Sequence, residues 1–236
     1  MVMTVHQPEH LPWLGFFDKI KQADLWVILD DVQYRRHYFQ NRNRIRTAAG
    51  SAWLTVPVWS ECGVTLIKDV QINDKAKWRR KCRETVRHAY IRAPFFETYM
   101  PMLDSVYGRS WASLVELNME LIRLLLQAFR IEKEIVLSSH LGRTERAGDL
   151  LLALAKECKA SVYLSGVSGR DYLKLDEFSR AGIEVRFQEF YHPIYPQLHQ
   201  PFEPCMSSID LLFNHGPRSA DIAFGSESSR LDKVFL

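Results

Sequence analysis

The chain has 236 residues, of which 47% are hydrophobic and 25% charged, and it carries a formal net charge of +3. This is the composition of an ordinary globular protein, and it excludes a disordered chain or a small fold that depends on disulfide bonds. The positive charge is too small to indicate nucleic-acid binding by itself.

The cysteines and the start of the chain indicate where the protein works. The four cysteines are scattered without a Cys-x-x-Cys pair, which is typical of reduced thiols inside the cell. The first residues lack the basic start and long apolar run of a signal peptide. The most apolar stretch, residues 121–129, is too short to cross a bilayer. We therefore expect a cytoplasmic protein with no membrane partner.

The first thirty residues predict a βαβ unit. Residues 2–5 form a short apolar run, and residues 25–29 form a second one. Between them, Trp13, Phe16 and Ile20 recur at helical spacing, which predicts a helix over 13–23. A strand, a helix and a strand in this order indicate a parallel sheet.

The middle of the chain changes from a loop to strands and then to helices. Residues 31–52 have no sustained period and are predicted to be a loop. Residues 53–58 and 64–72 are rich in β-branched residues and predict two strands, with a turn at Cys62-Gly63. Helical spacing follows over 75–89, 94–107 and 113–130.

The rest of the chain returns to alternating strands and helices. We expect strands at 134–137, 162–164 and 183–187, and helices at 144–157, 176–181 and 207–214, with Thr144 as a helix cap. Residues 191–204 are predicted to be a loop, and the tail after Ala223 is predicted to fray. The whole pattern predicts one α/β domain over 1–236. Its fold is Rossmann-like, with a mainly parallel sheet flanked by helices and a helical insertion at about 75–130.

Two groups of polar residues follow the first two predicted strands. His6, Gln7 and Trp13 lie where the first strand meets the first helix, a place that suits phosphate binding or proton transfer by His6. The alternative is a hydrogen-bonded histidine near the core. Asp30 and Asp31 follow the second strand and could hold Mg²⁺ or a sugar hydroxyl, although only one of two adjacent side chains would face the site. The alternative is a pair of solvated charges.

A basic and aromatic loop at 35–46 is the best indication of a phosphorylated ligand. Arginines bind phosphate through two hydrogen bonds, and aromatic rings stack on a base or a sugar. An RNA ligand would need the same residue types, and a solvated basic loop is the alternative. The residues predicted to bind are Gln40, Asn41, Arg42 and Arg44.

Two weaker candidates lie later in the chain. Ser165, Gly166, Ser168 and Gly169 form a glycine-rich loop after a buried strand, where the backbone could approach a ligand closely. An ordinary tight connection is the alternative. The second candidate, Tyr195, Gln197, His199 and Asp210, could complete a pocket or only pack. No zinc, calcium or catalytic-triad motif is present in the sequence, so no tightly bound metal is expected.

Many of these residues together resemble the WbqC-like family of surface-polysaccharide biosynthesis. His10 departs from the family pattern, where an aromatic residue is common, and Val167 stands where proline is common. The first departure argues against a catalytic role for His10. The resemblance runs through residues 6–8, 11–15, 17–20, 30–33, 40–45, 53–58, 78–81, 164–166, 195–197 and 209–214, and it adds Gln33 to the candidate binding residues.

The resemblance implies an enzyme that transfers an amino-acyl group, such as glycyl, to a nucleotide-linked amino sugar. ATP and Mg²⁺ are possible cofactors if the acyl group is activated as an adenylate. In this hypothesis His6, Arg42 and Arg44 neutralise phosphates, Asp30 or Asp31 holds Mg²⁺ or a sugar hydroxyl, and residues 165–169 line the nucleotide. The alternatives are a transferase that uses aminoacyl-tRNA and a non-catalytic scaffold, which would show an exposed apolar patch and no polar pocket.

Overall fold

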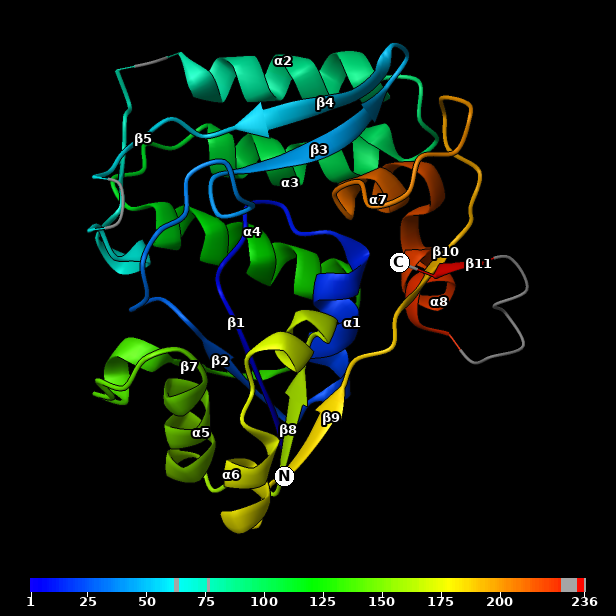
Figure 1. Ribbon diagram of the computed structural model, residues 1–236. Helices are drawn as coiled ribbons and strands as arrows, with labels where there is room; N and C mark the ends of the chain where they lie inside the picture. The colour runs from blue at the N-terminus through cyan, green and yellow to red at the C-terminus, as the bar shows by residue number, and fades with distance from the viewer. Residues whose placement is uncertain (62–63, 76, 226–232, 236) are drawn as a thin grey trace.

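A five-stranded parallel sheet lies at the centre of the computed structural model, which describes residues 1–61, 64–75, 77–225 and 233–235 (Figure 1). The order of its strands is β7-β2-β1-β8-β9, and every neighbouring pair is parallel. The predicted α/β, Rossmann-like fold is therefore confirmed. The strands are β1 (Val2–His6), β2 (Leu25–Ile28), β7 (Glu134–Leu137), β8 (Val162–Ser165) and β9 (Glu184–Phe187).

The strand order reverses at β1. The chain builds outward from β1 through β2 to β7, then returns to pair β8 against the other side of β1 and adds β9. Open parallel sheets bind ligands beyond the carboxyl ends of their strands, at this point of reversal. His6, Ile28 and Ser165 end β1, β2 and β8, so the segments that follow them meet at one edge of the sheet.

Side chains that alternate along the strands separate two hydrophobic cores. Met3 and Val27 pack with Leu154 of α5 (Ala147–Glu157) and with α6 (Leu175–Arg180) on one face of the sheet. Trp26 and Ile28 belong to the larger core on the other face, together with α1 (Leu14–Gln22) and α4 (Leu114–Ala128). Figure 1 shows α5 and α6 below the sheet and α4 above it.

The predicted loop at 31–52 is wrong over its second half. Residues Arg42–Thr47 form β3, which pairs antiparallel with β4, residues Gly50–Thr55. The strand was not recognised because both of its faces carry polar side chains: Asn43 is buried, whereas Arg42 and Arg44 point outward. Pairing with β4 and a hydrogen bond from Asn43 Nδ2 to the carbonyl oxygen of Leu11 (2.9 Å) stabilise the strand instead of an apolar face.

The predicted strand at 64–72 is also wrong over most of its length. Its middle is a short 3₁₀ helix, η1 (Ile67–Asp69), and only β6 (Gln71–Ile72) pairs, with β5 (Val58–Trp59). The backbone N–H groups of Ile67 and Lys68 donate to carbonyls of Val32 and Asp30, so this segment is held by the chain after β2. The turn expected at Cys62-Gly63 lies outside the described residues.

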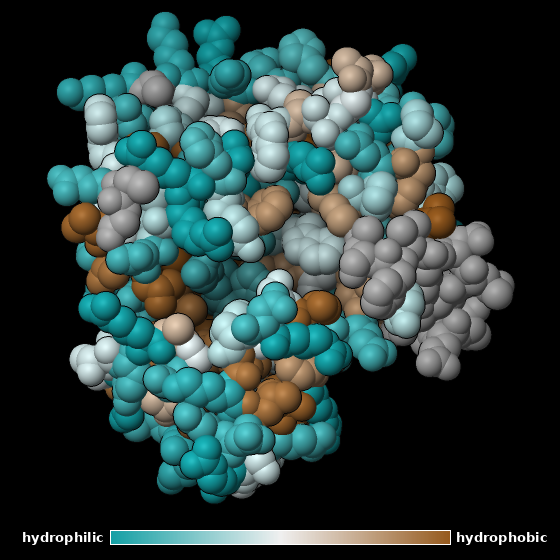
Figure 2. Space-filling model, viewed as in Figure 1, coloured by the Kyte–Doolittle hydropathy of each residue, from teal (hydrophilic) through white to brown (hydrophobic). Residues whose placement is uncertain are grey.

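The predicted helical middle is confirmed as α2 (Trp78–Tyr90), α3 (Phe96–Tyr107) and α4. Trp78, Cys82 and Val86 form the buried side of α2, as its sequence indicates. Hydrophilic side chains cover the molecule above α2 in Figure 2. The side chain of Ser113 caps α4 by accepting a hydrogen bond from the Glu116 N–H (3.4 Å).

The helix at 144–157 begins later than predicted. Thr144 is not its cap, because α5 begins at Ala147 with Arg146 at the N-cap position and no side chain bonded to its first N–H groups. The tail predicted to fray lies partly outside the described residues, but β11 (Lys233–Phe235) pairs with β10 (Tyr191–Pro193). The remaining elements are η2 (Ser138–His140), η3 (Val167–Asp171), α7 (Ile209–His215), η4 (Gly216–Arg218) and α8 (Ser219–Phe224). Within the described ranges, each helix is too short or too polar to span a bilayer.

Asn118 of α4 connects the loops at the carboxyl edge of the sheet. Its side chain is fully buried, and its Nδ2 donates to the carbonyls of Pro8 (3.1 Å) and Gln40 (2.7 Å). Its Oδ1 lies 3.3 Å from Nδ1 of His10. Because Oδ1 can only accept, His10 carries its proton on Nδ1, and Tyr107 donates to Nε2 across 3.0 Å.

We expect Asn118→Leu to lower the free energy of unfolding by about 3 kcal/mol, because it leaves two buried carbonyls and one ring N–H without partners. Urea unfolding measures this change, with Gln127→Leu on the exposed side of α4 as the control. A loss equal to that of the control would contradict the role of Asn118.

Candidate functional site

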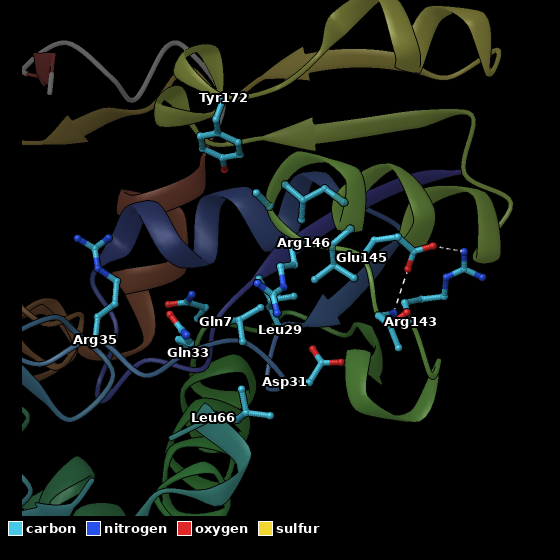
Figure 3. Close-up of a pocket in the computed structure, with 15 residues that line it drawn as sticks. Gln7, Leu29, Asp31, Gln33, Arg35, Leu66, Arg143, Glu145, Arg146 and Tyr172 are labelled. Carbon is cyan, nitrogen blue, oxygen red and sulfur yellow. Dashed lines mark hydrogen bonds and ion pairs between the residues drawn. The ribbon is translucent and has the colours of Figure 1, made fainter. Parts of the chain in front are cut away.

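A cavity of about 620 Å³ opens at the carboxyl edge of the sheet. Gln7 after β1, Leu29 and Asp31 after β2, and the start of α5 contribute to its wall, and Tyr172 closes one side. Figure 3 shows these side chains converging from segments that are distant in sequence. Its volume and its mixture of apolar and polar side chains are those of a small-molecule site.

Positive groups dominate the charge of the cavity. Arg35 and Arg146 are exposed in its wall, and in the part of the chain that the structure describes no ion pair joins either to an acidic side chain. Arg143 is different, because Glu145 (2.6 Å) and Glu157 (3.6 Å) neutralise it. The start of α5 adds backbone N–H groups with no side-chain cap. A helix start beside guanidinium groups that have no acidic partner favours an anion.

The two aspartates after β2 have different surroundings. Asp30 is buried, and its carboxylate accepts hydrogen bonds from Ser138 Oγ (3.0 Å), Ser139 N–H (3.0 Å) and Ser139 Oγ (2.7 Å). It therefore joins the end of β2 to η2. Asp31 also contacts Ser138 Oγ, but it is only half-buried and lies in the cavity wall. Of the two, Asp31 is the residue that a ligand can reach.

Two predicted glutamines lie at the cavity, and a third supports them. Gln7 and Gln33 line it. Gln40 is fully buried behind them, where its Nε2 donates to Gln7 Oε1 (2.6 Å) and its Oε1 accepts from the Arg35 N–H (3.2 Å). Gln40 therefore positions both Gln7 and the start of the basic loop.

The two histidines near the end of β1 are held neutral. Burial lowers the pKa of His10 to about 4, and its position between Asn118 and Tyr107 makes it a structural group. Burial, and secondly the charge of Lys19, lowers the pKa of His6 to about 3. His6 remains partly exposed, with its ring edge against Phe16.

Glu9 and Lys19 were not predicted as site residues, yet both are buried near His6. Lys19 is 5% exposed, and its Nζ donates to the carbonyl oxygen of Val5 across 3.1 Å. Glu9 is 4% exposed, and its Oε2 has no hydrogen-bond partner. The sequence carried one signal for Lys19: it lies three residues after Phe16, within the apolar stripe of α1.

The glycine-rich loop after β8 forms η3 and lies beside the end of β1. Gly169 is tightly packed, since a Cβ there would lie 2.0 Å from the Oγ of Ser165. Gly166 faces Lys19, whose Nζ would lie 4.0 Å from such an added Cβ. Ser165 is buried and Ser168 is exposed. Gly166 is thus the residue of this loop that approaches the end of β1.

Arg42 and Arg44 lie on the outer face of the β3–β4 hairpin, and neither lines the cavity. Their guanidinium carbons lie 4.2 Å and 5.8 Å from the ring centroid of Trp53, which is 45% exposed. Asn41 is buried and donates to the Val56 carbonyl, so it holds the hairpin rather than a ligand. The hairpin presents a separate basic and aromatic surface.

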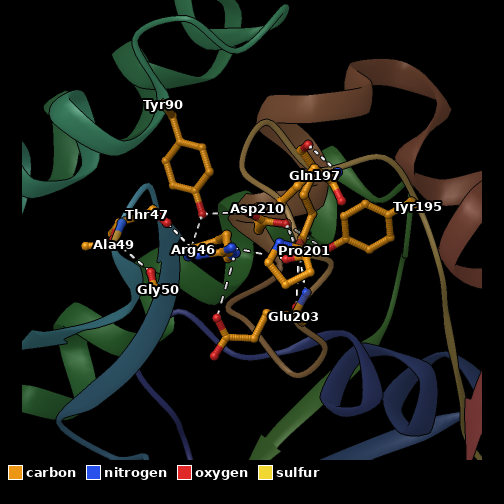
Figure 4. Close-up of polar contacts among 11 residues, drawn as sticks. Arg46, Thr47, Ala49, Gly50, Tyr90, Tyr195, Gln197, Pro201, Glu203 and Asp210 are labelled. Atoms are coloured by element: carbon orange, nitrogen blue, oxygen red, sulfur yellow. Dashed lines mark hydrogen bonds and ion pairs between the residues drawn. The ribbon is translucent and has the colours of Figure 1, made fainter.

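The candidates near the C-terminus form a buried network (Figure 4). Asp210 accepts hydrogen bonds from Tyr90 (2.8 Å), Tyr195 (2.9 Å) and Gln197 (2.9 Å), and burial raises its pKa. These three hydrogen bonds join α7, which carries Asp210, to α2 and to the loop after β10. His199 lies 2.9 Å from the Ala89 carbonyl, and Trp13 covers Gly15 beside Phe190. None of these residues lines the cavity.

Sequence reasoning missed two of the three arginines that line the cavity. Arg143 and Arg146 precede α5, and the sequence offered no periodic signal for them. Arg35 was recognised as part of a basic loop, but its position in the cavity depends on Gln40.

Asp30→Ala and Asp31→Ala are expected to lower the free energy of unfolding by unequal amounts. The first removes a buried carboxylate with three donors and should lower the free energy of unfolding by about 3 kcal/mol. The second should lower it by less than about 1 kcal/mol, because Asp31 is half-buried. Chemical unfolding of both variants checks this, and equal losses would contradict the assignment.

His10→Gln should remove one source of acid sensitivity. The pKa of His10 is about 4 in the folded chain and 6.5 ordinarily, so the unfolded chain binds more protons between these values. The stability that His10 supplies is present above pH 6.5 and falls by about 1.4 kcal/mol for each pH unit below it, toward pH 4. The difference in unfolding free energy between the wild type and His10→Gln should show this slope. A difference that is constant with pH would refute it.

Comparison with known proteins gave a matching family model and a matching relative. A family model described as "WbqC-like protein family" matches residues 7–222. An uncharacterized protein of Mycobacterium tuberculosis is 30% identical over 225 residues, which cover 93% of this chain and 96% of that protein. No solved structure matches. The family match begins directly after β1, ends within α8 and includes every residue that lines the cavity, so the chain belongs to the WbqC-like protein family.

Proposed function

We propose that this protein is an enzyme that forms an amide, by transferring an amino-acyl group such as glycyl to the amine of a nucleotide-linked amino sugar. The biosynthesis of surface polysaccharide is the setting that the family resemblance implies. The observation that carries the proposal is the cavity at the carboxyl edge, where Arg35, Arg146 and the start of α5 surround a space that suits a phosphorylated small molecule.

Each part of such a ligand has a counterpart in the cavity. Phosphate oxygens would accept hydrogen bonds from Arg35 and Arg146, whose guanidinium groups have no acidic partner among the described residues. Tyr172, which is 51% exposed, offers a ring for a base or a sugar to stack on. Asp31 and Gln7 would accept hydrogen bonds from sugar hydroxyls.

In the ATP-dependent form of this proposal, Mg²⁺ enters the cavity already bound to the phosphates of ATP. Among the described residues no group of three or more histidine, cysteine or acidic side chains could hold a metal ion. Mg²⁺ is commonly held by one carboxylate together with substrate phosphates. Asp31 is the carboxylate in place for this, and the ion would supply charge neutralisation to the phosphates.

A transferase that takes its acyl group from aminoacyl-tRNA is the second candidate. It is favoured by the outer face of the hairpin, where Arg42 and Arg44 flank the exposed ring of Trp53. Bases of single-stranded RNA stack on such rings, while arginines neutralise the phosphates. The scaffold alternative has less support, because it predicts no polar pocket.

A thermal-shift screen separates these candidates, since a ligand that binds only the folded chain raises its melting temperature. Nucleotide-linked amino sugars, ATP with Mg²⁺, free amino acids and tRNA form the panel. A shift with ATP and Mg²⁺ that an amino acid enlarges indicates activation as an adenylate. A shift with tRNA alone indicates the second candidate.

Arg146→Ala is expected to weaken the binding of the nucleotide-linked sugar about tenfold or more, because a charge-assisted hydrogen bond contributes about 1.5–3 kcal/mol. Calorimetry measures the dissociation constant, with the exposed Arg80→Ala on α2 as the control. Equal affinity in both variants would place the phosphates elsewhere.

A further inference from the structure

Glu9 and Lys19 are two buried titratable residues that the proposed function leaves unused. Lys19 extends from α1 toward the end of β1, where it donates to the Val5 carbonyl (3.1 Å). Its Nζ also lies against Gly166, the first residue after β8. Lys19 therefore lies between the carboxyl ends of β1 and β8, where the strand order reverses and where open parallel sheets bind their ligands. We refer to this place as the crevice between β1 and β8.

Glu9 belongs to the same crevice and has an unused acceptor. It comes from the loop between β1 and α1, and its Oε2 is buried without a hydrogen-bond partner. Glu9 and Lys19 are close enough for each charge to act on the other's pKa, yet no ion pair within 4.0 Å joins them among the described residues. The Oε2 of Glu9 therefore has no hydrogen-bond partner, although a cationic side chain lies near it.

Packing alone does not explain this arrangement. A buried charge is costly unless a partner and hydrogen bonds compensate for it, and apolar side chains of similar size would fill the same space at lower cost. Asp210 shows how this chain treats a structural carboxylate, because three donors satisfy it. Glu9 lacks such donors.

Burial brings the pKa of Glu9 close to neutral pH, where the group can exchange a proton. Burial raises the pKa of Glu9 to about 8, against the opposing charge of Lys19. Burial lowers the pKa of Lys19 to about 8, against the charge of Glu9. His6, on β1, is the third titratable group, and it stays neutral there.

We propose that Glu9, with Lys19 beside it, is the base that receives the proton of the substrate's amine in the crevice between β1 and β8. This inference rests on the proposed function and adds a residue and a place for its proton transfer. An amine of ordinary pKa near 8 matches a base of similar pKa, which is the condition for efficient transfer.

The amide bond forms between the amine of the sugar and an activated amino-acyl ester, which is the co-reactant. Binding of the ammonium group first releases to solvent the proton that Glu9 carries at pH 7. The ammonium group of the sugar then gives one proton to the Glu9 carboxylate, and the nitrogen lone pair forms the C–N bond to the acyl carbon. The bond from that carbon to the activating oxygen breaks, and the leaving group keeps the electron pair. The nitrogen then loses a second proton to the leaving group. Lys19 stays charged and keeps its hydrogen bond to the Val5 carbonyl of β1.

Calorimetry in two buffers of different ionisation enthalpy tests the proposal at pH 7. UDP-glucosamine is the probe, and UDP-glucose, which has a hydroxyl in place of the amine, is its matched control. Since both Glu9 and the ammonium group bring a proton, binding of the amine should release about one proton. UDP-glucose should release none. UDP-glucosamine should also bind about tenfold more tightly.

Glu9→Gln should abolish the proton release and the preference for the amine, whereas Glu97→Gln on the exposed side of α3 should change neither. Lys19→Met removes the charge that favours the Glu9 carboxylate, so it should raise the pKa of Glu9 in a carbon-13 NMR titration of the glutamate side chains. If the wild type and Glu9→Gln both bind UDP-glucosamine and UDP-glucose with equal affinity, the inference is overturned, but the proposed function is not. Binding of neither sugar overturns both.

Discussion

The parallel pairing of β1 with β2 on one side and β8 on the other is the constraint on which the site depends. A central parallel strand must be followed by a crossover, so the chain leaves β1 at the edge where β2 and β8 also end. The cavity lies over the ends of β1 and β2, and the crevice with Glu9 and Lys19 lies over the ends of β1 and β8. Both candidate sites therefore follow from one topological feature.

Buried polar side chains hold the loops of this edge in place. Asn118 bonds the segments after β1 and before β3, and Asp30 bonds the end of β2 to η2. Each such hydrogen bond adds little to the free energy of unfolding, but a buried group that loses its partner lowers that free energy considerably. This asymmetry favours a single arrangement of the edge, in which Asp31 and Gln7 line the cavity while Asp30 and Gln40 are buried beside it.

The sequence predicted the strands of the central sheet but not β3 of the hairpin, and the reason is physical. The strands of the sheet are buried on both faces, so each appears as a continuous apolar run. β3 has arginines on its outer face and Asn43 on its inner face, and its partner rather than its hydrophobicity makes it a strand. The same difficulty affected the candidate residues: Tyr195, Gln197 and Asp210 are polar because they satisfy one another in the core.

The sequence by itself determined the strands of the central sheet, the helical middle and the polar segments that end β1 and β2, because hydrophobic periodicity and chain direction are local properties. Only the tertiary structure decided which polar residues meet. Arg146 and Gln7 are far apart in the chain, and so are Lys19 and Gly166, yet each pair meets at the edge of the sheet. Burial, which brings the pKa of both Glu9 and Lys19 to about 8, is likewise a property of the packed chain, since the same residues in an open loop would keep their ordinary pKa values.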